Sequence, residues 1–305
     1  MTQPMAVALS GGLDSTVLLH ALHATGRPLI AVHVNHGLQP AAQDWPGHCA
    51  ALCAALNIPF ECLAVEVQDT GLGLEADARQ ARYAVLQRWM SAQDCSVLAT
   101  AHHRDDQVET VLLQLFRGSG IKGLAGMRAY GPMGVNRVQA VGMSLVRPLL
   151  DCTRRDLESY AGHHTLSWVE DPSNVDVSIR RNWLRRELLP ALREHFPQVD
   201  QGVLQLARHI ATGVQADALA HQSLVMTLCD SDLQLKLAAW RPLAPSTRTA
   251  FLKHWLEQGG IRCGREALLE LDRQLMASTQ GGRRQVTSGW CLKIHRGLAR
   301  IQREF

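Results

Sequence analysis

The sequence predicts an α/β protein: an open, mostly parallel β-sheet with flanking helices, followed by a smaller, mainly helical α+β domain. Over roughly the first 150 residues, short apolar runs alternate with longer segments of helical periodicity, which is typical of stacked βαβ units. Beyond that point the alternation stops and helical patterns dominate. A chain of 305 residues is also long enough for two domains. We predict domains at residues 1–214 and 215–305.

Four apolar runs are the predicted strands of the sheet, because strands of a parallel sheet are buried on both faces. They lie at residues 5–9, 28–34, 60–67 and 95–101. Apolar residues at helical spacing predict helices at residues 14–24, 41–56, 75–91 and 105–117. An extended segment at residues 145–150 is expected to end this part of the chain.

The second half of the chain has mainly helical patterns. Helices are predicted at residues 153–161, 180–195 and 200–228, and two more within residues 245–277. Residues 284–302 alternate in a way that predicts paired strands around Gly289 and Gly297.

The composition predicts a globular cytoplasmic protein with no membrane attachment. Hydrophobic residues make up 46% of the chain, and no apolar run approaches the roughly 20 residues needed to span a bilayer. The first residues lack the basic-then-apolar pattern of a secretion signal. The eight cysteines are scattered without a Cys-x-x-Cys pair, so a disulfide framework is not expected. Cys49 and Cys53 are expected to be buried as small apolar residues.

Charge is distributed unevenly along the chain. Residues 1–130 contain 8 Lys/Arg and 11 Asp/Glu, a net charge of −3, whereas residues 131–305 contain 23 and 17, a net charge of +6. The last 25 residues contribute six basic side chains: Arg283, Arg284, Lys293, Arg296, Arg300 and Arg303. A basic C-terminal half favours a polyanionic partner such as nucleic acid, although many neutral binders also have a basic face.

The segment Ser10-Gly11-Gly12-Leu13-Asp14-Ser15 lies between a predicted buried strand and a predicted helix. The two glycines allow several N–H groups to point inward and form an anion site, to which the helix adds its unsatisfied N–H groups. The serine hydroxyls can donate to phosphate oxygens, whereas Asp14 suits Mg²⁺ or a helix cap. A phosphate-binding loop is therefore predicted, with a simple capped turn as the alternative.

Polar residues also follow the second predicted strand, in His33-Val34-Asn35-His36-Gly37. Because open α/β sheets bind ligands at the carboxyl ends of their strands, His33, Asn35 and His36 are candidates for binding adenine or ribose. On the next predicted helix Arg79 and Arg82 are three residues apart and share one face. A solvated helix face is the alternative interpretation of this pair.

The segment His102-His103-Arg104-Asp105-Asp106-Gln107-Val108-Glu109 follows the fourth predicted strand and begins a helix. Asp106 and Glu109 are three residues apart, so both carboxylates lie on one helix face. Acidic residues in a first turn also favour the helix dipole, but five titratable groups in eight positions exceed what a cap requires. We predict that these carboxylates bind a cationic substrate or Mg²⁺, and that Arg117-Gly118-Ser119-Gly120 forms a loop over the site.

A turn and an arginine cluster complete the pattern. Glu170-Asp171-Pro172-Ser173-Asn174 has the chemistry of a turn. The helix predicted after it contains four arginines that are candidates for phosphate contacts: Arg180, Arg181, Arg185 and Arg186. A solvated helix face is again the alternative.

These motifs together resemble a known family. Residues 10–15 lack the Gly-Lys-Ser/Thr ending of the Walker type and resemble the PP-loop of the N-type ATP pyrophosphatases, whose fold is adenine-nucleotide alpha-hydrolase-like. With HVNHGL, EADARQARY, AHHRDDQVET, LFRGSG, WVEDPSN and RN-x-x-R in order, residues of about 6–190 resemble the tRNA(Ile)-lysidine synthetase family.

The resemblance implies a ligase reaction and its partners. ATP, with Mg²⁺, would adenylate the C2 oxygen of the wobble cytidine in an isoleucine tRNA with a CAU anticodon, and free L-lysine would displace AMP. Asp106 and Glu109 would hold lysine's amino groups and Arg82 its carboxylate. Asp14, a tentative Mg²⁺ ligand, and His103 complete the implied catalytic set. Whether His103, a carboxylate or pyrophosphate removes the amine proton stays open, and a homodimer is expected.

Two departures and two alternatives accompany this interpretation. The chain begins almost at its first strand, where family members usually have a short helical segment, and its C-terminal part resembles only the first of their substrate-binding domains. Selection of tRNA is therefore expected to depend on residues 215–305, on residues 180–195 and on Arg117.

A PP-loop tRNA thiolase is the closest alternative function, disfavoured by the absence of Cys-x-x-Cys pairs. A tRNA- or nucleotide-binding protein without catalysis is the other.

Overall fold

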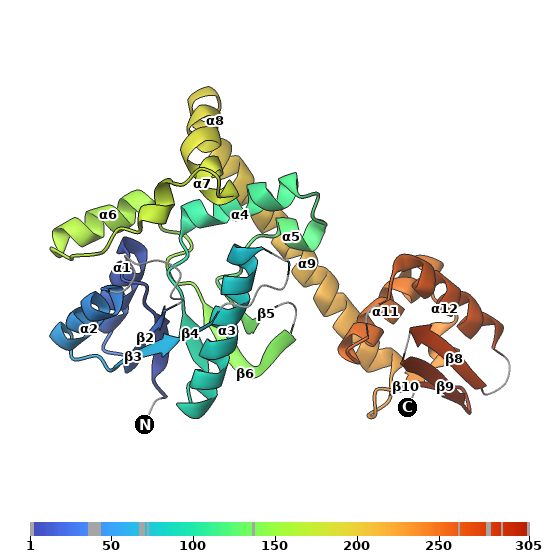
Figure 1. Ribbon diagram of the computed structural model, residues 1–305. Coiled ribbons are helices and arrows are strands. Elements are labelled where there is room, and N and C mark those ends of the chain that lie inside the picture. The colour runs from blue at the N-terminus through green and yellow to red at the C-terminus, as the bar shows by residue number, and fades with distance from the viewer. Residues whose placement is uncertain are drawn as a thin grey trace. The chain divides into compact units, whose positions relative to one another are not determined.

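The chain folds into two compact units, Met1–Ile210 and Ala211–Phe305, which Figure 1 shows in a computed structural model. The structure describes residues 3–35, 44–66, 71, 73–135, 138–261, 263–278, 282–287 and 289–303. The boundary between the units falls within helix α9 (Val199–Leu228), a few residues before the predicted division at 214/215. The predicted fold class is confirmed, because a mostly parallel sheet with flanking helices precedes a smaller unit of helices and an antiparallel sheet.

The sheet of the first unit has the strand order β3-β2-β1-β4-β6-β5. Neighbouring strands are parallel except for β5, which is antiparallel to β6. The strands are β1 (Met5–Ala8), β2 (Leu29–Asn35), β3 (Phe60–Ala64), β4 (Val97–Ala99), β5 (Tyr130–Val135) and β6 (Val138–Val146). The four predicted strands are confirmed.

The hairpin of β5 and β6 is a feature that the sequence did not predict beyond an extended segment at residues 145–150. The sequence of β5 is YGPMGV, and its two glycines and proline are residues that strands normally avoid. Its position at the edge of the sheet explains why proline is tolerated there, since an edge strand has N–H groups that need no partner in the sheet.

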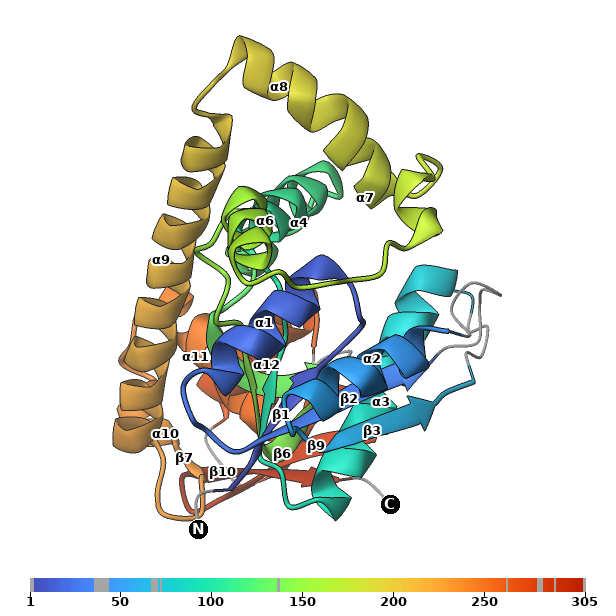
Figure 2. The same cartoon turned by 90° about the vertical axis from the view of Figure 1, so that its left-hand side faces the viewer.

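Helices cover both faces of this sheet. On one face lie α1 (Leu13–His23), α2 (Trp45–Ala55) and α6 (Arg154–His163), and on the other lies α3 (Leu74–Ala92), as Figure 2 helps to show. Alternate residues of β1 pack on opposite sides, as side chains of a strand must. Met5 and Val7 contact the first group of helices, whereas Ala6 packs with α3.

A further group of helices follows the carboxyl end of β4. Helix α4 (Arg104–Phe116) begins there and leads to α5 (Ile121–Leu124). Later in the chain, α7 (Arg180–Trp183), a π-helical turn (Leu184–Leu188) and α8 (Leu189–His195) form one continuous run, which confirms the helix predicted at residues 180–195. Apolar contacts hold this run and the start of α9 against α4, with Val108, Leu112, Leu184, Leu189 and Leu204 at their centre.

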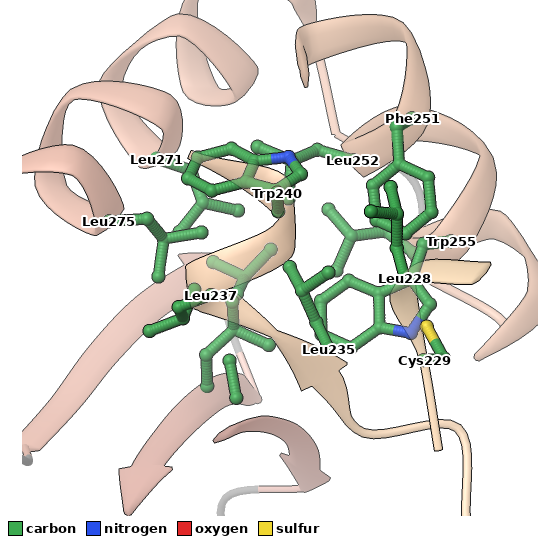
Figure 3. Close-up of a cluster of buried hydrophobic side chains, with 14 of the residues drawn as sticks. Leu228, Cys229, Leu235, Leu237, Trp240, Phe251, Leu252, Trp255, Leu271 and Leu275 are labelled. Carbon is green, nitrogen blue, oxygen red and sulfur yellow. The ribbon is translucent and has the colours of Figure 1, made fainter. Parts of the chain in front are cut away.

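The second unit contains an antiparallel sheet with the strand order β7-β10-β9-β8. Its strands are β7 (Leu235–Lys236), β8 (Gly282–Thr287), β9 (Trp290–His295) and β10 (Leu298–Arg303), and its helices are α10 (Leu237–Trp240), α11 (Pro245–Gln258) and α12 (Arg265–Ala277). The paired strands predicted around Gly289 and Gly297 are confirmed, and both glycines have positive φ. Figure 3 shows the core, in which Trp240, Phe251 and Trp255 are fully buried.

Within the described residues, no helix is both long and apolar enough to cross a membrane.

A buried ion pair joins the two long helices of the second unit. Arg248 of α11 donates from Nε to Asp272 Oδ1 and from Nη2 to Asp272 Oδ2, both at 2.8 Å. The guanidinium also lies 5.5 Å from the centre of the Trp240 ring, a distance typical of a cation–π contact. Removal of the arginine would leave the carboxylate of Asp272 buried without its partner.

We therefore predict that Arg248→Met lowers the free energy of unfolding of this unit by about 3 kcal/mol, because breaking one side of a buried pair leaves an uncompensated charge. The measurement is denaturant unfolding followed by tryptophan fluorescence. Arg273→Met is the matched control, since Arg273 pairs with Glu270 on the exposed face of the same α12, where an ion pair contributes little to stability. Equal destabilisation of the two variants would contradict the prediction.

Candidate active site

The order of the strands predicts a ligand-binding crevice between β1 and β4. The chain connections leave β1 toward β2 on one side, whereas β4 pairs with β1 on the other. Such a topological switch point opens a crevice at the carboxyl ends of the two strands. Residues 10–15 follow β1, and residues 100–103 follow β4. The two segments with the most polar sequence motifs therefore meet at one edge of the sheet.

The loop after β1 has a backbone that only glycine adopts easily. Gly11 has a φ of +87°, and a Cβ atom at this position would lie 3.1 Å from Cys49 Sγ and 3.1 Å from a methyl group of Val169. Helix α1 begins after Gly12, so the first N–H groups of the helix are available to a ligand. This local backbone structure is suited to the anion site that the sequence predicts.

The two serines of the loop hold each other. Ser10 Oγ and Ser15 Oγ are 3.0 Å apart, and Ser15 Oγ also lies 3.0 Å from the carbonyl oxygen of Gly12, to which it donates. The backbone N–H of Ser10 donates to Ser15 Oγ at 3.1 Å. Ser15 is buried, whereas Ser10 is exposed. Ser15 therefore stabilises the turn, and Ser10 is the serine that presents a hydroxyl to the crevice.

Asp14 lies in the first turn of α1 and faces the segment after β4. Its Oδ2 is 3.7 Å from His103 Nε2, and its Oδ1 is 3.6 Å from Arg154 Nη1. Oδ1 is buried and has no hydrogen-bond partner among the described residues. Burial is the largest influence on this carboxyl group and raises its pKa, even though His103 and Arg154 act in the opposite direction.

The two adjacent histidines have opposite electrostatic environments. Burial, reinforced by the charge of Arg147, lowers the pKa of His102 to about 3, so this ring is neutral. Burial also disfavours the charge on His103, but the surrounding carboxylates outweigh it and raise the pKa of this ring. Nδ1 of His103 is 3.6 Å from Asp105 Oδ2, and Nε2 is 3.5 Å from Asp106 Oδ2. These contacts are longer than hydrogen bonds and act as electrostatic attraction.

Asp106 and Glu109 meet two arginines from the later helix, and these four residues form the carboxylate–arginine cluster. Arg181 donates from Nε to Glu109 Oε2 at 2.6 Å and from Nη2 to Asp106 Oδ1 at 3.0 Å. Arg185 donates from Nε to Glu109 Oε1 at 2.6 Å and from Nη2 to Glu109 Oε2 at 3.0 Å. The side chain of Glu109 is only 1% exposed. The carboxylates predicted to bind a cation thus bind guanidinium groups of the chain itself.

Residues 170–174 support this cluster from the other side. Asn182 donates from Nδ2 to the carbonyl oxygens of Ser173 at 2.8 Å and Asp176 at 2.9 Å, which ties the turn to α7. The N–H of Val169 donates to the carbonyl oxygen of Gly11 at 2.9 Å. The turn therefore contacts the phosphate loop at one end and the helix of Arg181 at the other. We call residues 169–182 the brace.

The residues predicted to contact adenine and the carboxylate of lysine lie around the end of β2 and on α3. His33 is buried and its Nδ1 lies 2.8 Å from the carbonyl oxygen of Leu9, so this ring supports the strand before the loop. Asn35 ends β2, and His36 lies outside the described residues. Arg82 is exposed on α3. Burial is the largest cause of the lowered pKa of His33, the hydrogen bond to Leu9 opposes it, and the charge of Arg82 adds to the lowering. Arg82 is therefore close to the ring of His33.

The predicted tRNA contacts divide into two groups. Arg181 and Arg185 belong to the cluster, whereas Arg117, Arg180 and Arg186 are exposed at the surface. Arg117 follows the last residue of α4, and the glycines after it include Gly118 with positive φ. Arginines that were predicted to act together on tRNA therefore have two environments, the ion-paired cluster and the exposed surface.

Sequence reasoning assigned no role to several residues that hold the site. Arg193 donates to Asp105 at 3.1 Å, and the N–H of Arg154 donates to the same carboxylate at 2.9 Å. Gln107 donates to and accepts from the backbone of Met127, at 2.9 and 2.7 Å. Gln107 lies within AHHRDDQVET and Asn182 within RN-x-x-R, so the sequence motifs could have indicated a role for these two residues. Arg154 and Arg193 lie outside every motif, and nothing in the sequence indicated theirs.

The cysteines near the site are packing residues. Cys49 and Cys53 of α2 are fully buried in the core beneath the phosphate loop, as predicted. Burial raises the pKa of Cys49 to about 12 and that of Cys53 to about 11. Both groups therefore remain protonated thiols, which are poor nucleophiles and poor metal ligands.

Comparison with known proteins identifies similar chains. Among curated relatives, the tRNA(Ile)-lysidine synthase of Alkalilimnicola ehrlichii is 46% identical over 276 residues, covering 87% of this chain and 58% of the relative. That of Pseudomonas putida is 42% identical over 264 residues, covering 83% and 60%. The chain thus spans less than two thirds of the length of either relative.

A solved structure has the same fold. A U34-tRNA thiolase from Methanococcus maripaludis, determined with its [4Fe-4S] cluster, has a TM-score of 0.54 and 18% sequence identity, covering 68% of this chain and 72% of that one. At this identity the likeness shows the fold alone.

The family model that describes the PP-loop domain matches residues 1–192. This range contains the sheet, the glycine loop after β1, the carboxylates of α4 and the arginines that pair with them. The chain therefore belongs to the PP-loop family.

Proposed function

We propose that this chain has tRNA(Ile)-lysidine synthase activity, an ATP-dependent ligation of lysine to RNA. The observation that carries the proposal is the carboxylate–arginine cluster beside the phosphate loop: two carboxylates already bind cationic groups where a crevice can hold an activated substrate. The curated relatives, 42–46% identical over most of this chain, support it. The activity is expected in the cytoplasm, as predicted from the sequence.

The reaction requires two displacements. The O2 oxygen of cytidine forms a bond to the α-phosphorus of ATP, and pyrophosphate leaves. An amine of lysine then forms a bond to C2 of the base, AMP leaves with the former O2 oxygen, and the amine loses a proton. The first requirement is to stabilise the negative charge of the phosphates. The N–H groups at the start of α1 and the hydroxyl of Ser10 are proposed to do so.

Asp14 is the residue that would hold Mg²⁺ beside those phosphates. Its buried Oδ1 lacks a hydrogen-bond partner among the described residues, and a metal ion or its water would satisfy it. Within the same residues, no group of three His, Cys, Asp or Glu side chains could hold a metal. This fits Mg²⁺, which takes one or two carboxylates and completes its shell with phosphate oxygens and water. When bound, the ion would neutralise phosphate charge.

Lysine binding is assigned to Asp106 and Glu109. An ammonium group has the same charge as the guanidinium groups that these carboxylates now bind, so exchange with one of them keeps the cluster neutral. Arg185 is the more exposed partner, with 34% of its side chain accessible against 28% for Arg181. Arg82 stays the proposed partner of the lysine carboxylate.

His103 serves this scheme better as a fixed charge than as a base. Burial disfavours the charge on this ring, but the surrounding carboxylates outweigh burial and raise its pKa, and a protonated imidazole cannot accept a proton. It instead attracts Asp14 and Asp106, which belong to the phosphate side and the lysine side of the crevice. We infer that a carboxylate or the released pyrophosphate accepts the amine proton.

The isoleucine tRNA is the proposed macromolecular substrate. The exposed Arg117, Arg180 and Arg186 are proposed to contact its phosphates, and Arg181 and Arg185 could reach a phosphate only after leaving the cluster. The homodimer expected from the sequence stays a prediction. A thiolase is disfavoured, because the sequence has no Cys-x-x-Cys pair and the two thiols beneath the phosphate loop, those of Cys49 and Cys53, are buried.

The second unit offers a row of cations suited to RNA. Lys293 of β9 lies opposite Arg283 of β8 and Arg300 of β10 in the register of the sheet, so three basic side chains share one exposed face. Like charges placed directly opposite are destabilising, and no ion pair compensates these three among the described residues. We call them the cationic row and propose that it contacts the tRNA backbone.

The central prediction is transfer of labelled lysine to RNA. Wild-type protein incubated with ATP, Mg²⁺, labelled L-lysine and a CAU-anticodon isoleucine tRNA should incorporate label into RNA and release AMP and pyrophosphate. A tRNA whose wobble cytidine is replaced by uridine is the control and should stay unlabelled. Absence of label with folded protein and intact tRNA would refute the proposed function.

A second prediction separates lysine binding from adenylation. Asp106→Asn and Glu109→Gln should each raise KM for lysine about tenfold or more, because a hydrogen bond to a charged group is removed. Release of pyrophosphate with tRNA but without lysine should persist. Glu194→Gln is the matched control, since Glu194 is exposed on α8 and belongs to neither the phosphate loop nor the cluster. If pyrophosphate release fails first, these carboxylates serve ATP and Mg²⁺ instead.

A third prediction concerns the cationic row. The double variant Lys293→Ala/Arg300→Ala should weaken tRNA binding and reduce the dependence of log Kd on log salt by about 0.7–0.9 for each phosphate that the protein no longer neutralises. The KM for ATP should not change. Arg265→Ala/Arg273→Ala removes the same charge from exposed positions on α12 and is the control. If both double variants weaken tRNA binding equally, only the net charge of the protein matters and the cationic row is not a specific contact.

A further inference from the structure

An exposed groove lies beside the carboxylate–arginine cluster, and neither the phosphate loop nor the cluster uses it. It is formed by the end of α4, by α7 and by the π-helical turn, and has a volume of about 460 Å³, within the range of small-ligand sites. We call it the aromatic groove. Its lining residues are Leu113, Phe116, Arg117, Arg180, Trp183, Leu184 and Leu188.

The groove continues directly from the proposed lysine site. Glu109, Leu113 and Phe116 follow one another at helical spacing along one stripe of α4. At a rise of 1.5 Å per residue, Phe116 is about 10 Å along the helix axis from Glu109. On the opposite wall, Arg180 and Trp183 alternate with the cluster residue Arg181. A substrate that reaches the cluster therefore passes close to the groove.

The chemistry of the groove combines exposed aromatic rings with unpaired cations. Phe116 is 58% exposed and Trp183 is 45% exposed. Arg117 and Arg180 are also exposed, and neither has an ion-pair partner within the described part of the chain. Aromatic rings flanked by arginines are the combination that binds unpaired nucleotides, since bases stack on the rings and phosphates bind the cations. A purely apolar groove would suit a protein helix better.

We propose that the aromatic groove binds an unstacked nucleotide of the tRNA anticodon loop, next to the one that is modified. Its base would stack on Trp183, with Phe116 completing the wall of the groove, and its phosphate would bind Arg117 or Arg180. This rests on the proposed function, because chemistry on a base requires that the base leave its stack. A neighbouring base held in the groove keeps the loop open and positions the target base at the crevice.

The test measures Kd for a CAU-anticodon isoleucine tRNA with wild-type protein and with Trp183→Ala. Removal of one stacking interaction should weaken binding about tenfold. Phe196→Ala is the matched control, because Phe196 is an aromatic residue 63% exposed outside the groove, and its Kd should not change. Trp183→Phe keeps a ring and should retain most of the affinity, which separates stacking from a fault in folding.

A second set of RNAs identifies the stacked base. Each carries an abasic nucleotide immediately before or after the wobble position. One of them should bind wild-type protein about tenfold more weakly, and Trp183→Ala should weaken binding of that RNA no further, because the two changes remove the same stacking interaction. The proposal would be overturned if, for both RNAs, the abasic nucleotide and Trp183→Ala weakened binding independently, so that their effects on Kd multiplied. It would also be overturned if Trp183→Ala left Kd unchanged.

Two readouts separate nucleotide binding in the groove from self-association and from the ligase reaction. If light scattering shows that Trp183→Ala dissociates an oligomer while the affinity for RNA is unchanged, the groove is a protein interface and the proposal is wrong. Lysine incorporation by the wild-type protein is measured with the same tRNA. If no lysine is incorporated but the binding effects are non-additive as expected, the lysidine activity is refuted and the RNA subsite is supported. If lysine is incorporated but Trp183→Ala leaves the Kd for tRNA unchanged, only the proposal for the groove is refuted.

Discussion

Glu109 is a buried carboxylate whose charge is compensated by Arg181 and Arg185 from a different part of the chain. A carboxylate with so little exposure is strongly unfavourable without partners, so burial of α4 requires that the arginine-bearing helix lie against it. Apolar contacts between Leu112 and Leu184 stabilise this packing, whereas the ion pairs determine which turns of the two helices face each other. The crevice, the groove and the brace all depend on that alignment.

The switch point of the sheet brings hydrogen-bond donors and carboxylate acceptors together at one edge. Phosphate binding at residues 10–15 requires donors, and lysine binding requires acceptors, and the switch point brings both kinds of group to one sheet edge. His103 lies between them, close to both Asp14 and Asp106. A protonated ring in this position would offset the repulsion between these two carboxylates.

Much of this arrangement could be predicted from local sequence patterns. The strands of the parallel sheet are apolar runs, and the phosphate loop depends on adjacent glycines, so both can be recognised within a few residues. The β5–β6 hairpin could not, because its glycines and proline are atypical of strands. Contacts between distant segments were also beyond reach: nothing near Arg181 in the sequence indicates that its partner is Glu109, 72 residues earlier. The brace residue Asn182 was visible only as part of a motif.

The brace connects the phosphate loop to the carboxylate–arginine cluster, for which two different substrates are proposed. At one end Val169 bonds to the carbonyl group of Gly11, and at the other Asn182 holds the turn of Ser173 to the helix of the cluster arginines. A displacement of the phosphate loop would therefore reach, through the brace, the helix whose arginines bind Asp106 and Glu109. If ATP and lysine bind as proposed, occupancy of one subsite can change the affinity of the other without direct contact between the two ligands.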